Sequence, residues 1–84
     1  MVPERGGDVH IVLEIDREED GRWIAEVPQM PGVMAYGATL EDAQARASAL
    51  ALRVVADRLE NGEITRPVNV ISMTRHEPMA VSQG

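Results

Sequence analysis

Between Val9 and Asp16 apolar and polar side chains alternate, and this pattern constrains the fold more than any other stretch. One side of an extended chain would carry Val9, Ile11, Leu13 and Ile15, and the other would carry His10, Val12, Glu14 and Asp16. Alternation with a period of two is typical of a strand with one buried face. The chain must therefore form a sheet, one face of which is covered.

The residues that follow predict a hairpin. Residues 17–21, Arg-Glu-Glu-Asp-Gly, are charged and end in glycine, as hairpin loops often do. We expect a second strand from Arg22 to Val27. The register that puts both apolar sets on one face pairs Ile15 with Trp23, Leu13 with Ala25 and Ile11 with Val27. This register also sets Asp16 opposite Arg22, with a five-residue loop between them.

Turn and cap signals define the rest of the chain. The prolines and glycine of residues 28–32 end the second strand, and a short third strand is expected over 33–36, closed by Gly37. Thr39 is placed to cap a helix over 40–60 that stops at Asn61-Gly62. A last strand is expected from Val68 to Thr74. The pattern predicts a single α+β domain of β-β-β-α-β order over 1–84, with one helix on a four-stranded sheet, an ordered core of about 8–75 and a loose tail from 76.

Composition excludes several classes of function. The 84 residues contain no cysteine, so disulfides and thiol chemistry are absent. The net charge is -6, and such a surface repels phosphate backbones, so we expect no direct nucleic-acid binding. The first residues lack a signal peptide and no run is long enough to span a membrane. We expect a cytoplasmic protein.

The predicted helix is apolar over more of its circumference than one contact requires. The stripe expected to cover the sheet comprises Leu40, Ala43, Ala47, Leu50, Ala51 and Val54. A second apolar arc includes the candidate oligomer contacts Leu52, Val55, Ala56 and Leu59. One helix is also too narrow for four strands, which leaves Val12, Ile24 and either Met34 or Tyr36 on an uncovered sheet face. We therefore expect a homo-oligomer, a dimer or higher.

No constellation of residues predicts catalysis. His10 and His76 are far apart and lack a metal-ligand partner at helical or turn spacing, so both are interpreted as surface histidines. The hypothesis of a Mg²⁺-dependent nuclease would use Glu14, Asp16 and Glu26, which share one face of the first hairpin. Solvated strand charges explain them better. We assign no catalytic, cofactor-binding or metal site and expect a binding protein, not an enzyme.

The segment from Trp23 to Ala47 resembles the HicB antitoxin family. The pattern that carries the resemblance is a V-P-x-x-P-G turn, a short strand, and then G-x-T-x-E-E-A opening a helix. It falls here on Val27, Pro28, Pro31, Gly32, Gly37, Thr39, Glu41, Asp42 and Ala43. The resemblance covers roughly Val9 to Met73. Met34 stands where many relatives carry cysteine, and Asp42 replaces the usual glutamate.

The resemblance implies a partial ribonuclease-H-like fold without catalytic acids, in which the last strand lies beside the first. It also implies a partner, a small basic HicA-type toxin that cleaves mRNA with a histidine, whose active site the antitoxin covers. Six acidic residues are candidates for facing such a toxin: Glu14, Asp16, Glu18, Glu19, Asp20 and Glu26.

The resemblance stops at the C-terminus. Full-length members add a ribbon-helix-helix or helix-turn-helix domain that binds the operator, and residues 74–84 are too few for either. We therefore expect no operator binding by this chain. The alternative hypothesis is a stand-alone homo-oligomeric binding module of unknown ligand with no toxin partner.

Overall fold

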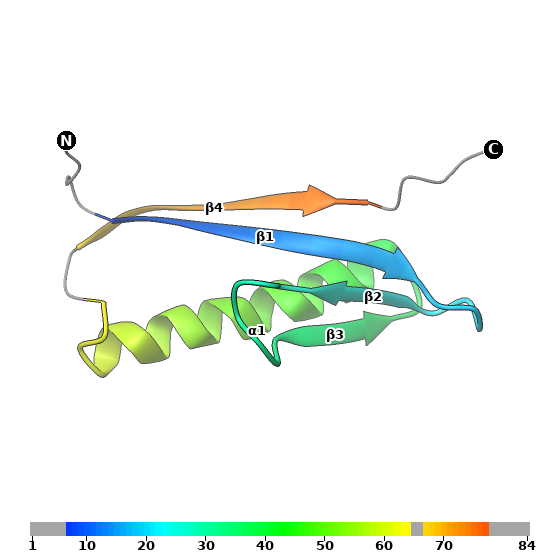
Figure 1. Ribbon diagram of the computed structural model, residues 1–84, viewed down its shortest axis with the longest axis horizontal. Coiled ribbons are helices and arrows are strands. Elements are labelled where there is room, and N and C mark those ends of the chain that lie inside the picture. The colour runs from blue at the N-terminus through cyan, green and yellow to red at the C-terminus, as the bar shows by residue number, and fades with distance from the viewer. Residues whose placement is uncertain (1–6, 65–66, 78–84) are drawn as a thin grey trace.

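The computed structural model describes residues 7–64 and 67–77 (Figure 1). In chain order the elements are β1 (Gly7–Arg17), β2 (Trp23–Glu26), β3 (Met34–Gly37), α1 (Leu40–Glu60) and β4 (Val68–His76). The four strands form one sheet in the order β3-β2-β1-β4, in which β1 is antiparallel to β2 and parallel to β4. This confirms the predicted α+β architecture of one helix on a four-stranded sheet.

The core lies between α1 and one face of the sheet. The alternation in β1 is confirmed, because Ile11, Leu13 and Ile15 are buried while Glu14 and Asp16 are exposed. Full burial of a side chain such as that of Ile11 or Leu13 contributes about 1.5–3 kcal/mol to stability. The helix meets these residues with four small or β-branched side chains one turn apart: Ala43, Ala47, Ala51 and Val55. Their small size brings α1 close to the sheet.

The predicted register of the first hairpin is wrong by two residues. Ile15 lies opposite Ala25 and Arg17 lies opposite Trp23, so the predicted pair of Asp16 and Arg22 does not form. The cause is a tighter turn than expected. Gly21 has φ +93° and donates to the carbonyl of Glu18 at 2.9 Å, and this leaves a loop of only three residues, 19–21. A shift of two residues preserves both faces of the strands.

The turn after β2 is held from both ends. Val27 donates its N–H to the carbonyl of Val33 at 3.0 Å, which closes the segment that the two prolines interrupt. The side-chain amide of Gln29 binds the neighbouring strand: it accepts from the N–H of Val12 at 2.8 Å and donates to the carbonyl of His10 at 2.7 Å. Gln29 therefore occupies the place beside β1 that the next residue of β2 would take.

The predicted bounds and N-cap of α1 are confirmed. The side-chain oxygen of Thr39 accepts from the N–H of Asp42 at 3.0 Å, and Glu41 and Asp42 lie in the positive first turn. At the other end, the N–H of Asn61 donates to the carbonyl of Asp57 at 2.9 Å. Within residues 7–64 and 67–77, no helix is long and apolar enough to cross a bilayer.

β4 is two residues longer than predicted. It continues through Arg75 and His76 because β1 still offers a partner there, with Leu13 beside Arg75 and Glu14 beside His76. The predicted tail from residue 76 is therefore corrected at His76, and residues 78–84 of that tail lie outside the described residues. The position of β4 beside β1 is the arrangement expected from the resemblance.

Gly37 ends β3 directly against the start of α1. A Cβ atom at this position would lie 2.4 Å from the backbone nitrogen of Ala43. We expect Gly37→Ala to lower the free energy of unfolding by about 2–3 kcal/mol, since backbone must move to admit the methyl group. Gly21→Ala is the control: its Cβ meets open space, and its positive φ should cost only about 1–2 kcal/mol. Urea denaturation of both variants measures the difference, and an equal or smaller cost at Gly37 would contradict the close contact.

Candidate protein-binding surface

The sheet has one face that no described helix covers, and we call it the open face. Since α1 packs on the side of Ile11 and Leu13, the alternate residues of every strand point to the opposite side. The open face consists of Asp8, His10, Val12, Glu14, Asp16, Ile24, Glu26, Met34, Tyr36, Val70, Ser72, Thr74 and His76. The two predicted groups, the uncovered apolar residues and the hairpin carboxylates, therefore share this surface.

Three carboxylates cluster on the open face across β1 and β2. Glu14 lies directly opposite Glu26, and Asp16 lies opposite Ile24 in the next row. The predicted register had placed Glu14 opposite Ile24, and the two-residue shift corrects this. All three carboxylates are exposed, and none forms an ion pair with another described residue. The shift therefore concentrates negative charge more than the sequence alone suggested.

Apolar side chains border this cluster on the β3 side. Met34 is the partner of Glu26 and Tyr36 is the partner of Ile24, and both Met34 and Tyr36 are exposed. The guanidinium carbon of Arg22 lies 4.3 Å from the centre of the Tyr36 ring, which holds the ring in place through a cation–π contact. An apolar patch beside charged groups is the usual composition of a protein-binding surface.

The other three predicted acidic residues lie in the turn at the end of β1. Glu19 and Asp20 are exposed and Glu18 is partly buried. Asp20 already has a partner, since its carboxylate accepts from the backbone N–H of Arg22 at 3.0 Å and from the Nε of Arg22 at 2.8 Å. The backbone hydrogen bond, followed by the contact with the guanidinium, lowers the pKa of Asp20 below its ordinary value. Asp20 therefore has less capacity for a partner than Glu14 or Glu26.

The two histidines of the open face have different surroundings. His10 contacts two hydroxyl groups of β4, with Nδ1 2.8 Å from the Oγ of Ser72 and Nε2 3.2 Å from the Oγ1 of Thr74. His76, which the sequence assigned to a tail, stands beside Glu14 in the register. Among residues 7–64 and 67–77, no three side chains of the metal-binding types are arranged so that they could hold one metal ion.

The candidate oligomer contacts on α1 divide into two groups. Leu52 and Leu59 are each 40% exposed and Ala56 is exposed as well, so these three lie on the outer side of the helix. Val55 is only 3% exposed and belongs to the core. The reason is its spacing, because Val55 follows Ala51 by four residues and continues the buried stripe.

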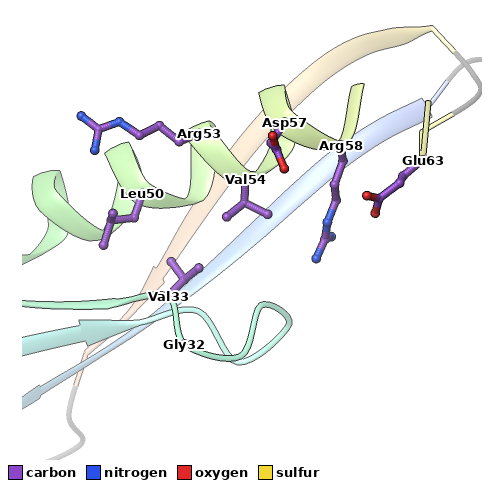
Figure 2. Close-up of a pocket in the computed structure, with 8 residues that line it drawn as sticks. All are labelled: Gly32, Val33, Leu50, Arg53, Val54, Asp57, Arg58 and Glu63. Atoms are coloured by element: carbon purple, nitrogen blue, oxygen red, sulfur yellow. The ribbon is translucent and has the colours of Figure 1, made fainter. Parts of the chain in front are cut away.

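A groove of about 570 Å³ lies between α1 and the turn after β2 (Figure 2). Val33 and Val54 point toward each other across it, and at its end the side chain of Glu63 points toward that of Arg58. Its lining combines two arginines, Arg53 and Arg58, with two acidic residues, Asp57 and Glu63. These opposite charges cancel. The groove therefore distinguishes a basic partner from an acidic one less well than the open face does.

The lowered pKa of Asp20 predicts a pH effect on stability. Because folding favours the charged carboxylate, its contribution is present above the unfolded pKa of the group and is lost as pH falls through the lowered folded value. We expect Asp20→Asn to destabilise the chain at neutral pH and to have little effect once the carboxyl is protonated in both states. In an NMR titration, Arg22→Gln should raise the pKa of Asp20 only part of the way, because the backbone donor remains. A carboxyl that titrates at or above its ordinary value would contradict this.

Comparison with known proteins adds no relative to this description. No family model matches the chain, and neither a curated protein nor a solved structure matches it.

Proposed function

We propose that this chain is a HicB-like antitoxin domain that neutralises a small, basic, mRNA-cleaving HicA-type toxin through the open face of its sheet. Two features of the fold support the partial ribonuclease-H-like identity. The elements follow the order β-β-β-α-β, and β4 returns to lie parallel beside β1. Both features are what the resemblance in residues 23–47 implies for the whole domain.

The facing pair of Glu14 and Glu26 is the observation that carries the proposal. Like charges directly opposite each other in a sheet are destabilising, by about 0.2–1 kcal/mol for a pair. Asp16 adds a third negative charge in the next row, and no described cation pairs with any of the three. A cationic side chain from a partner would remove this repulsion. The free domain therefore has an electrostatic cost that a basic partner relieves on binding.

The apolar residues that border the cluster would slow dissociation of a partner, which charges alone do not do. Charged pairs at an interface mainly raise the association rate and select the partner, whereas buried aromatic and aliphatic side chains slow dissociation. Tyr36 and Met34 are exposed within one strand of Glu26. A basic protein that docks on the carboxylates would cover both of them.

The same surface explains how binding inhibits RNA cleavage. A toxin that cleaves mRNA must present positive charge to the phosphate backbone of its substrate. A domain with net charge -6 that occupies this positive surface excludes RNA by position and also repels it. Inhibition therefore requires no chemistry from the antitoxin.

Purification from the native host tests whether the chain has a basic toxin as its partner. We expect the tagged chain to bring with it, in stoichiometric amount, a small basic protein that cleaves RNA when alone and not when bound. Recovery of the chain without such a protein, as a homo-oligomer only, would contradict the proposal. That result would instead support the stand-alone binding module.

The double variant Glu14→Gln, Glu26→Gln tests the surface. We expect the free chain to become more stable by about 0.2–1 kcal/mol, while association with the basic partner slows and depends less on salt. Urea denaturation and stopped-flow binding at several salt concentrations measure the two effects.

A matched control removes the same charge elsewhere. Glu60→Gln with Glu63→Gln changes two carboxylates around the C-terminal end of α1, away from the open face. This control should leave both the salt dependence and the association rate closer to those of the unmodified chain. Equal effects of the two double variants would show that only net charge matters and would exclude the open face as the binding surface.

A further inference from the structure

β4 is an outer strand of the sheet along its full length. It spans nine residues and pairs with β1 on one side, and no described element lies on its other side (Figure 1). By contrast, β3 at the opposite edge has only four residues. Val70 and Ile71 of β4 are 50% and 45% exposed, and as neighbours in a strand they point to opposite faces. The edge is therefore apolar on both of its faces.

The hydrogen-bonding groups along this edge can be identified from the register. The N–H of Val12 points toward β2, because it donates to Gln29, so the alternate residues Val9 and Ile11 point toward β4. The Cα partners of Val9 and Ile11 are Ile71 and Met73. In a parallel ladder a residue hydrogen-bonds to the two residues on either side of its Cα partner and not to the partner itself. The backbone groups of three residues in the regular part of β4 consequently face away from the sheet: Ile71, Met73 and Arg75.

Most of the edge lacks the features that usually prevent pairing, and the one irregularity lies near its start, where Gly7 pairs with Val68 and Asp8 with Val70, so that Asn69 is an extra residue. Natural sheets protect long outer strands with prolines, lysines, inward-facing charges or bulges. No proline or lysine lies within β4, and its register with β1 is regular from Asp8 to Glu14. Its charged or titratable residues, Arg75 and His76, lie together at its C-terminal end. Seven consecutive residues, 68–74, are thus uncharged and open on one side.

We propose that a second copy of this chain adds to this edge, so that the two β4 strands pair antiparallel about a two-fold axis at Ser72. This register places Ile71 opposite Met73 of the other copy, so that their outward-facing backbone groups pair, and it places Arg75 opposite Asn69, at the irregular start of β4. The result joins two four-stranded sheets into one continuous sheet with both helices on the same side.

The distribution of charge along β4 favours a second copy of this chain, paired in the antiparallel direction. A parallel second strand in register would align Arg75 with Arg75 of the other copy, which is repulsive. The antiparallel arrangement instead places the two Arg75 side chains at opposite ends of the interface, each opposite a neutral Asn69. It also pairs apolar Ile71 with apolar Met73 twice, so the strand complements itself.

The helix leaves room for this contact. The backbone of α1 approaches β1, β2 and β3 but not β4, while the side chain of Arg75 donates to the Oε1 of Gln44 at 2.8 Å. Ile71 is exposed for that reason. In the pair, Ile71 and Met73 of both copies form one apolar surface between the two helices. The interface therefore lies on β4 and not on the helix side chains Leu52 and Leu59, and it does not depend on the proposed function.

Single cysteines test the register, since the chain has none of its own. Facing residues at a non-hydrogen-bonded position of an antiparallel pair have Cα atoms about 4.5 Å apart, which a disulfide can span. We expect Ser72→Cys to form a disulfide-linked dimer under mild oxidation. Val70→Cys alone should not, because its two copies lie about 13 Å apart along the strands. A mixture of Val70→Cys and Thr74→Cys should cross-link, since these positions face each other. Equal cross-linking by every variant would overturn the register.

Sedimentation equilibrium tests the interface itself. We expect the unmodified chain to sediment as a dimer at micromolar concentration and Ile71→Lys to sediment as a single chain of 9.2 kDa. Leu52→Asp is the control, because it places a charge on the exposed side of α1 and should leave the dimer intact. Circular dichroism checks that each variant is folded. A monomeric unmodified chain, or a dimer that Leu52→Asp dissociates and Ile71→Lys does not, would overturn the proposal.

Discussion

The rest of the structure depends on how β1 is covered. It is the long central strand, with β2 on one side and β4 on the other, and its inward residues Ile11 and Leu13 are fully buried. A single helix must cover them. It does so with a stripe of alanines that ends in Val55, and this brings α1 so near the sheet that Gly37 admits no side chain. The chain contains no phenylalanine and only one tryptophan and one tyrosine, so close packing of small side chains provides most of the helix–sheet contact. A change in the volume of a side chain there is therefore costly.

The presence of a single helix also determines which surfaces of the sheet remain exposed. One helix about 10 Å wide covers β1, β2 and β3 on one face and leaves most of β4 exposed, although Met73 packs against the edge of the core. On the other face, no described element covers the sheet at all. The two candidate interfaces follow directly from this: the open face combines carboxylates with Tyr36 and Met34, and the edge of β4 combines free backbone groups with Val70 and Ile71. Both arise because the sheet is wider than its only helix.

Local signals in the sequence were sufficient for the elements, and long-range geometry was not. Thr39 and Asn61-Gly62 gave both ends of α1, because caps and stops are decided by a few neighbouring residues. The hairpin register failed because a five-residue and a three-residue loop fit the same alternation, and only the positive φ of Gly21 distinguishes them. Val55 was assigned to the wrong face because an ideal helical wheel does not show where the sheet lies. The end of β4 failed because it depends on the length of β1, a distant segment.

The residues that carry the family resemblance have structural roles first. Gly37 allows the close approach of α1, Thr39 caps it, and the two prolines end β2. These structural roles would be required for any function on this fold, whereas residues that the fold does not need indicate a specific function. Glu14 and Glu26 are such residues, because facing like charges oppose folding. They lie one and two strands away from β4 and outside its free edge, so a dimer formed through β4 would present two acidic faces on the same side of one sheet. A basic partner could then bind each copy without competing with the contact between copies.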